Sequence, residues 1–195
     1  DDEEKSIEDA AKKFTDSNDS AAKDAVSGDE KTVKKVLELL TLQKKMETAM
    51  TADVDTNVSD EEAEQKKMQY VLFSTKTKGS DGNSTDMSDD EKAEVKKKAE
   101  DFQKDAASAE DFSVFATAVG ASATDLTFDS DTTSPNEDLI KAADKLKEGE
   151  VTDVIEADNG YYVAKVVSLL DRDATDTKKE SIVSQRKSDQ YQSIC

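Results

Sequence analysis

The side chains of this chain that could do chemistry are mostly carboxylates. The 195 residues include 46 Asp and Glu but no His, and the single Cys is the last residue, Cys195. Triads of the Ser-His-Asp type are therefore excluded, and a metal site would have to be built from carboxylates. One cysteine cannot form an intramolecular disulfide, so we interpret Cys195 as an incidental thiol. We expect neither a metal nor a cofactor.

Adjacent acids stand where helices are expected to begin. Glu61-Glu62 and Asp89-Asp90 could suggest the paired carboxylates of a glycosidase. Each pair, however, follows a serine in the pattern of a capping box, at Ser59–Glu62 and Ser88–Glu91. Acids in a first turn are also favoured by the helix dipole. We interpret both pairs as helix starts.

The charge balance excludes several classes of partner. The formal net charge is -19, with 37% charged and 34% hydrophobic residues. Such a surface repels phosphate backbones and anionic lipid, so we expect no nucleic-acid partner. No apolar run approaches the roughly 18 residues of a membrane span, so we expect no transmembrane segment in this chain. The chain starts at Asp1 without Met or a visible signal peptide, which we interpret as a mature form without its signal segment.

Apolar spacing predicts helices at both ends of the chain and short strands between them. The acidic residues 1–30 carry few large apolar groups and can bury little by themselves. The later pattern alternates between a helical period and a period of two. In chain order it predicts a helix at 31–50, a strand at 68–73, a helix after Ser88, a shorter helix opened by Ser108, an extended piece at 124–128, a helix at 139–146, strands at 151–156 and 161–169 around a tight turn, and a polar helix at 175–194.

The most specific motif lies near the C-terminus. Leu-x-x-Gly-Glu-Val-Thr at 146–152 precedes Gly-Tyr-x-Val-x-Lys-Val at 160–166. This pair resembles the closing segment of parvulin-type peptidyl-prolyl isomerases, and the match extends upstream through Tyr70–Phe73 and Asp111–Ala116 to cover about Lys66 to Leu170. The resemblance implies an α+β, FKBP-like fold, in which helices cover a small antiparallel sheet.

The resemblance also implies where a site would lie. Parvulins set a pair of histidines, near a Cys or Asp, beneath an apolar pocket for the prolyl ring. Here the histidine positions hold Tyr70 and Tyr162, and the first carboxylate after the Cys/Asp position is Asp125. The implied catalytic residues are thus Tyr70, Tyr162 and Asp125, and the implied substrate-binding residues are Leu126, Phe128 and Leu139.

Two interpretations of the tyrosines remain open. They replace a buried polar pair by aromatic bulk, with hydroxyls bonded to each other or to the backbone, or their hydroxyls keep the hydrogen-bonding role and slow isomerase activity. Asp125 equally fits a brace within its loop. Because residues 68–72 and 162–166 alternate with period two, we expect both rings on one face of adjacent antiparallel strands.

The predicted organisation has three parts. A helical lobe at 1–63 precedes a parvulin-like domain at 64–171, and a C-terminal helix at 172–195 is expected to pack on the lobe. This arrangement resembles PrsA- and SurA-like extracytoplasmic foldases, whose flanking helices hold unfolded chains. It implies a foldase, secreted or tethered to the outer face of the cell membrane, that binds unfolded or extended polypeptides; a homodimer stays open.

Two other functions compete with the foldase. One is a holdase chaperone without catalysis, and the other is a surface structural protein that keeps the fold and has lost the groove. The distinguishing feature is whether the candidate residues line an open apolar concavity or fill it. Those residues are Tyr70, Leu126, Phe128, Leu139 and Tyr162.

Overall fold

The chain forms two compact units. The computed structural model describes residues 2–17, 30–78 and 83–194, so Cys195 lies outside the described residues. One unit comprises residues 58–182 and the other comprises 1–57 together with 183–195. The division therefore falls before the expected boundary at residue 63 and, at the C-terminal end, inside a helix.

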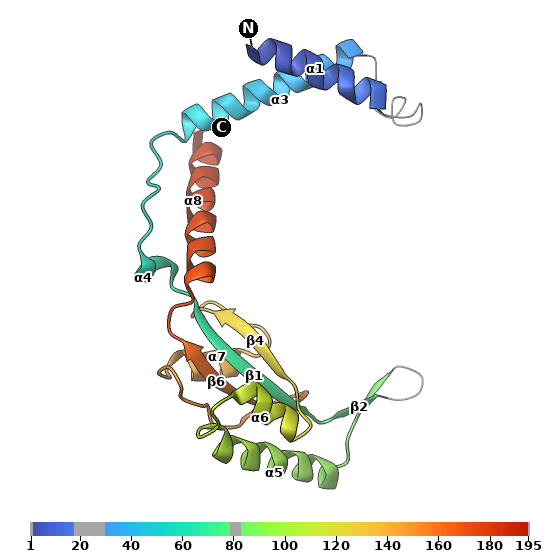
Figure 1. Ribbon diagram of the computed structural model, residues 1–195, viewed down its shortest axis with the longest axis vertical. Coiled ribbons are helices and arrows are strands. Elements are labelled where there is room, and N and C mark those ends of the chain that lie inside the picture. Colours follow the sequence, from blue (N-terminus) through green and yellow to red (C-terminus); the bar gives the residue numbers. More distant parts are fainter. Residues whose placement is uncertain (1, 18–29, 79–82, 195) are drawn as a thin grey trace. The chain divides into compact units, whose positions relative to one another are not determined.

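A four-stranded antiparallel sheet forms the centre of the 58–182 unit (Figure 1). Its strand order is β4-β1-β6-β5, so the long strands β1 and β6 lie inside and β4 and β5 form the edges. The strands are β1 (Lys66–Ser74), β4 (Ala123–Phe128), β5 (Ile155–Ala157) and β6 (Gly160–Ser168), and a separate small sheet pairs β2 (Lys76–Lys78) with β3 (Ser84–Asp86). The α+β class with a small antiparallel sheet is confirmed.

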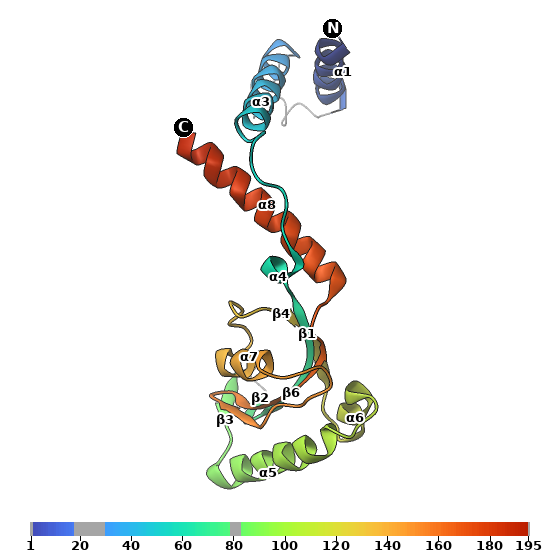
Figure 2. The same ribbon diagram turned by 90° about the vertical axis from the view of Figure 1, so that its left-hand side faces the viewer.

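Helices cover both faces of this sheet (Figure 2). On one face, α5 (Asp89–Ala106) and α6 (Phe112–Ala118) pack on Val71, Phe73 and Val163. On the other face, α7 (Glu137–Asp144) packs on Met68 and Val166. The period-two alternation of β1 therefore supplies two separate hydrophobic cores.

Local hydrogen bonds explain most helix starts. Ser88 forms both halves of the predicted capping box with Glu91 at the start of α5. At the short helix α4 (Asp60–Ala63), the Ser59 hydroxyl accepts the backbone N–H of Glu62 at 3.2 Å. The N-termini of α5 and α4 thus each have a side-chain acceptor for an otherwise unpaired amide.

The predicted opening of a helix at Ser108 is wrong. The Ser108 hydroxyl donates to the Asp105 carbonyl at 3.0 Å, so it closes the end of α5 instead. Asp111 is the N-cap of α6, and its carboxylate accepts the Val114 N–H at 2.9 Å. A serine hydroxyl serves either end of a helix, and the sequence pattern did not distinguish the two uses.

The predicted strand at 151–156 is also shorter than expected. Only a single bridge joins Val151 to Lys165 before β5 begins at Ile155. The reason lies at Thr152, whose hydroxyl accepts the Ala164 N–H at 3.0 Å in place of a backbone carbonyl. This side-chain bond competes with a regular ladder and releases the next two residues from it.

The other unit is helical. In it, α1 (Asp2–Ser17) packs along α3 (Glu30–Met50), with Ala11 and Val33 buried and an ion pair between Lys34 and Glu8. Beyond this contact, five large apolar side chains of α3 are 45–58% exposed, and we refer to them as the α3 apolar face: Val36, Leu39, Leu40, Leu42 and Met46.

The last helix, α8 (Arg172–Ile194), contributes to both units. Within the helical unit, the Gln190 side chain donates to the Met50 carbonyl at 2.7 Å and Arg186 donates to the Asp55 carbonyl at 2.9 Å. No helix among the described residues is long and apolar enough to cross a membrane.

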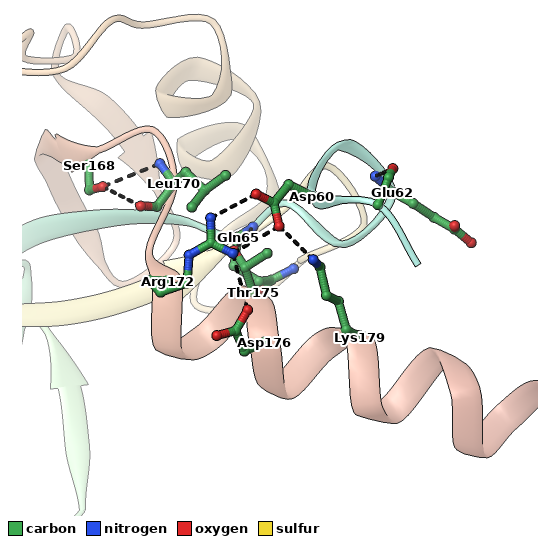
Figure 3. A network of polar contacts seen from close by, with 10 residues as sticks. Asp60, Glu62, Gln65, Ser168, Leu170, Arg172, Thr175, Asp176 and Lys179 are labelled. Carbon is green, nitrogen blue, oxygen red and sulfur yellow. Dashed lines mark hydrogen bonds and ion pairs between the residues drawn. The ribbon is translucent and has the colours of Figure 1, made fainter. Parts of the chain in front are cut away.

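Within the 58–182 unit, a polar network holds the first turns of α8 (Figure 3). Asp60 accepts two hydrogen bonds from Arg172, at 2.8 and 2.7 Å, and lies 2.6 Å from the Lys179 ammonium. These hydrogen bonds hold the pKa of the Asp60 carboxyl well below its usual value. Thr175 accepts the Gln65 N–H at 3.1 Å, so α8 is also fixed to the start of β1.

Asp129 makes a second attachment to α8. Burial alone would raise the pKa of this carboxyl, but hydrogen bonds from Gln65, at 2.6 Å, and Lys178, at 3.1 Å, outweigh it and lower the pKa to about 2. The ionised form is therefore favoured in the folded state.

This lowered pKa predicts acid sensitivity. Because the folded-state value lies below the ordinary value, Asp129 stabilises the fold above about pH 4, and that contribution is lost as the pH falls towards 2. Asp129→Asn should lower the free energy of unfolding at neutral pH and flatten its slope between these pH values, as measured by urea unfolding. The exposed neighbour Asp131 supplies the charge-matched control, since Asp131→Asn removes no bond to Gln65 or Lys178 and should lower the free energy of unfolding less.

The aromatic cluster under α5 should dominate the stability of this unit. The Phe102 ring lies 5.4 Å from those of Phe73 and Phe112 and 5.0 Å from that of Phe115, measured between centroids. Phe102→Ala should lower the free energy of unfolding by about 3–5 kcal/mol. Val114→Ala on α6, whose side chain is 66% exposed, should change it by less than about 0.5 kcal/mol. Equal effects in chemical denaturation would contradict this assignment.

Candidate functional site

Tyr70 on β1 and Tyr162 on β6 lie side by side. Their ring centroids are 5.9 Å apart and the planes are inclined at 58°. In the register of the two strands, Tyr70 is opposite Ala164 and Leu72 is opposite Tyr162, which puts both rings on the α7 face of the sheet. The expectation of one shared face on adjacent antiparallel strands is confirmed.

The two hydroxyls have different environments. The Tyr162 hydroxyl accepts a hydrogen bond from the Asn159 amide at 2.9 Å. The Tyr70 hydroxyl has no hydrogen-bond partner among the described residues, and every buried side-chain oxygen there has one, so this hydroxyl is reached by solvent. One of the two interpretations had the hydroxyls bonded to each other or to the backbone, and no such bond is found among the described residues.

The apolar candidates belong to the same face but mostly fill it. Phe128 and Leu139 have no exposed surface and Tyr162 is 3% exposed, whereas Tyr70 and Leu126 are half-buried. All five belong to the core cluster under α7. A side chain without exposed surface cannot contact a ligand in this conformation, so Phe128 and Leu139 act here as core residues.

Asp125 is not part of this group, contrary to its predicted place beside the tyrosines. In the β1–β4 register it is opposite Gln69, whereas Thr124 is opposite Tyr70, so strand alternation turns Asp125 to the other face. The Gln69 amide donates to its carboxylate at 2.9 Å, and this bond, with the Lys67 ammonium at 3.4 Å, lowers the pKa of Asp125.

A glycine fixes the turn that carries Asn159. Gly160 has a φ of +143°, and a Cβ atom there would lie 2.1 Å from the Phe73 carbonyl oxygen. Only glycine permits this approach, which brings β6 against β1 and sets the register that pairs the tyrosines. The Asn159 contact was missed from the sequence, because the Asp-Asn-Gly signal predicts a turn but not where the amide points.

The comparison with protein families decides the identity of this unit. A model of the PPIC-type PPIase domain matches residues 63–178, more than half of the chain. The chain belongs to the PPIC-type PPIase family. The match spans the sheet, all three of its covering helices and the tyrosine pair.

Several solved structures are similar over most of the chain. PrsA from Bacillus cereus, described as a peptidylprolyl isomerase, shares 17% identity with a TM-score of 0.40, covering 96% of this chain and 67% of that one. PrsA from Bacillus anthracis shares 18% identity with a TM-score of 0.35, covering 94% of this chain and 81% of that one. PrsA from Bacillus subtilis shares 22% identity with a TM-score of 0.31, covering 97% of this chain and 73% of that one. A comparison with curated proteins found no match.

In this PPIC-type domain the paired positions supply shape rather than charge. Two uncharged rings stand where the resemblance places histidines, and one hydroxyl is bound by an amide while the other meets solvent. In the part of the chain that the structure describes, no three carboxylate or thiol groups are placed to hold a metal. The site therefore offers an apolar wall with two weak hydrogen-bonding groups.

The two hydroxyls should differ in their contribution to stability. Tyr162→Phe removes the acceptor of the Asn159 amide and should cost about 0.5–1.5 kcal/mol in the free energy of unfolding. Tyr70→Phe removes a solvated hydroxyl and should change stability by less than about 0.5 kcal/mol. Urea unfolding of the two variants measures the difference, and a larger loss for Tyr70→Phe would show that its hydroxyl has a structural bond.

Proposed function

We propose that this chain is an extracytoplasmic foldase of the PPIC-type family that binds unfolded or extended polypeptides and isomerises Xaa-Pro bonds only slowly. The observation that carries the slow isomerisation is that Phe128 and Leu139, which the resemblance places in the substrate pocket, have no exposed surface. In the proposal, residues 64–171 form the isomerase-like domain, and residues 1–63 with the helix at 172–195 form the client-holding lobe. The extracytoplasmic setting rests on the sequence resemblance of these flanks.

The chemistry of the reaction explains why activity should be low without being forbidden. Rotation about the Xaa-Pro bond has an uncatalysed barrier of about 20 kcal/mol and requires neither a nucleophile nor, in principle, a proton transfer. A catalyst has to bind the twisted amide more tightly than either planar form. A surface filled by its own side chains, with Tyr70 and Tyr162 in the paired positions, has little room for that preference.

The α3 apolar face supports the binding of clients. Single exposed apolar side chains are ordinary, but five large ones on one helix form a patch of the kind used to bind other chains. The same patch favours a second candidate function, a holdase without catalysis. The rate of Xaa-Pro isomerisation distinguishes the slow foldase from the holdase.

A coupled assay of Xaa-Pro isomerisation, run beside an aggregation assay of an unfolded client at low salt, tests the proposal. We expect the isomerisation rate to be at least about a hundredfold below that of a histidine-containing PPIC domain, a loss of about 2.7 kcal/mol in barrier lowering, while aggregation is still suppressed. A rate equal to the family's would make Tyr70 and Tyr162 working catalytic residues. Suppression with no isomerisation at all would favour the holdase, and the absence of both activities would favour the structural protein.

The α3 apolar face should be the part of the lobe that suppresses aggregation. Leu39→Ser with Leu42→Ser should weaken suppression several-fold, because both side chains are more than half exposed and lose apolar contact area. Val114→Ser, at a still more exposed position on α6, is the control and should leave suppression unchanged. Equal losses in the two variants would remove the lobe from the proposal.

A further inference from the structure

The outer edge of β4 has no partner strand. All six residues of β4 pair with β1 on one side, from Ala123 opposite Val71 to Phe128 opposite Lys66, and β4 is the last strand of the sheet on its other side (Figure 1). In an antiparallel strand, alternate residues direct their N–H and C=O groups away from the neighbour. No hydrogen bond to these outward groups is found within the described part of the chain.

The side chains of β4 leave this edge accessible. Thr124, Asp125 and Thr127 are exposed, and Leu126 is half-buried. The strand is six residues long, about 20 Å at 3.4 Å per residue, which is enough for a second strand to pair along it. The opposite edge, β5, has only three residues and offers half that length.

Three usual protections of a free edge, namely lysine, proline and a bulge, are missing from β4. Natural sheets guard their edges with lysine, proline or a bulge, and the β4 sequence Ala-Thr-Asp-Leu-Thr-Phe contains neither lysine nor proline. The β1–β4 register also runs without a shift. The one charge, Asp125, is drawn back over β1 by Gln69 at 2.9 Å and Lys67 at 3.4 Å, so it does not stand across the edge.

We propose that the free edge of β4 binds an extended segment of a client polypeptide as an added strand. Main-chain hydrogen bonds would supply the affinity, and alternate side chains would supply the preference, as in other cases of strand addition. On the tyrosine face, a client side chain beside Leu126 would be apolar, whereas on the opposite face it would lie beside Thr127 and the Asp125–Lys67 pair and would be polar. This inference rests on the proposed function and assigns an entry point for clients outside the filled pocket.

The first test uses a fluorescein-labelled peptide of alternating valine and threonine with terminal lysines, mixed with the full chain. Hydrogen exchange followed by mass spectrometry should show slower exchange across residues 123–128 when the peptide is present, because outward amides become bonded. The same peptide N-methylated along its centre keeps its side chains but cannot pair, and it should bind at least about tenfold more weakly. Protection confined to α3, no binding, or equal binding of the methylated peptide would overturn the inference.

Variants of β4 provide the second test. Adjacent residues send their N–H groups to opposite sides of a strand, so one of Thr124→Pro and Asp125→Pro removes an outward N–H while the other breaks a bond to β1. The variant that keeps the wild-type melting temperature should lose peptide binding, and Thr124→Ala, which keeps the backbone, should not. Retained binding in the folded proline variant would overturn the inference; if both proline variants unfold, the methylated peptide on the unaltered chain decides.

Suppression of client aggregation, measured on the same samples, separates this inference from the proposed function. If the unaltered chain suppresses aggregation and β4 shows no protection, only the added strand is wrong. If suppression is absent and β4 is still protected by the peptide, the proposed function fails and the strand-binding edge stands.

Discussion

The alternation of β1 is the constraint on which the rest of the structure depends. Strand β1 lies between β4 and β6, so both of its edges are paired and its side chains point alternately to the two faces of the sheet. Val71 and Phe73 therefore enter one core under α5 and α6, and Met68 enters the other under α7. A shift of one residue in the pairing of β1 would exchange the side chains that β1 sends into the two cores and would separate Tyr70 from Tyr162. Gly160 protects the register, since no other residue fits against the Phe73 carbonyl.

The same alternation explains which parts of the site could be predicted. The shared face of Tyr70 and Tyr162 followed from period-two patterns in two long strands, and their place on neighbouring strands followed from the resemblance to parvulins. The position of Asp125 did not follow, because the resemblance placed it only as the first carboxylate after the Cys/Asp position, and that says nothing about which face of the strand it takes. Thr124, opposite Tyr70, lies on the tyrosine face, and Asp125, one residue further along β4 and opposite Gln69, lies on the other face.

The helices and strands could be predicted where two or more residues form a recognisable pattern. They could not be predicted where the hydrogen bond of a single side chain determines where an element begins or ends. The capping box predicted at Ser88 is present in the structure, where Ser88 and Glu91 each accept a backbone N–H of the other. Ser108 and Thr152 act through single hydroxyls, one ending α5 and the other interrupting a strand, and neither use has a distinctive spacing. Burial was equally hidden: Leu126, Phe128 and Leu139 suit a pocket wall and a core alike, and only packing showed that the last two have no exposed surface.

Filling the pocket changes what binding can accomplish in a PPIC-type domain. A surface that binds a chain without preferring the twisted amide lowers the free energy of every state equally, so it gains affinity and no rate. Such a surface is free to use groups that do not distinguish proline, such as the backbone of an edge strand or the α3 apolar face. The net charge of -19 limits this freedom, because it repels acidic clients. In the proposed function, tyrosines at the paired positions therefore suit a domain that holds extended chains better than one that accelerates a bond rotation.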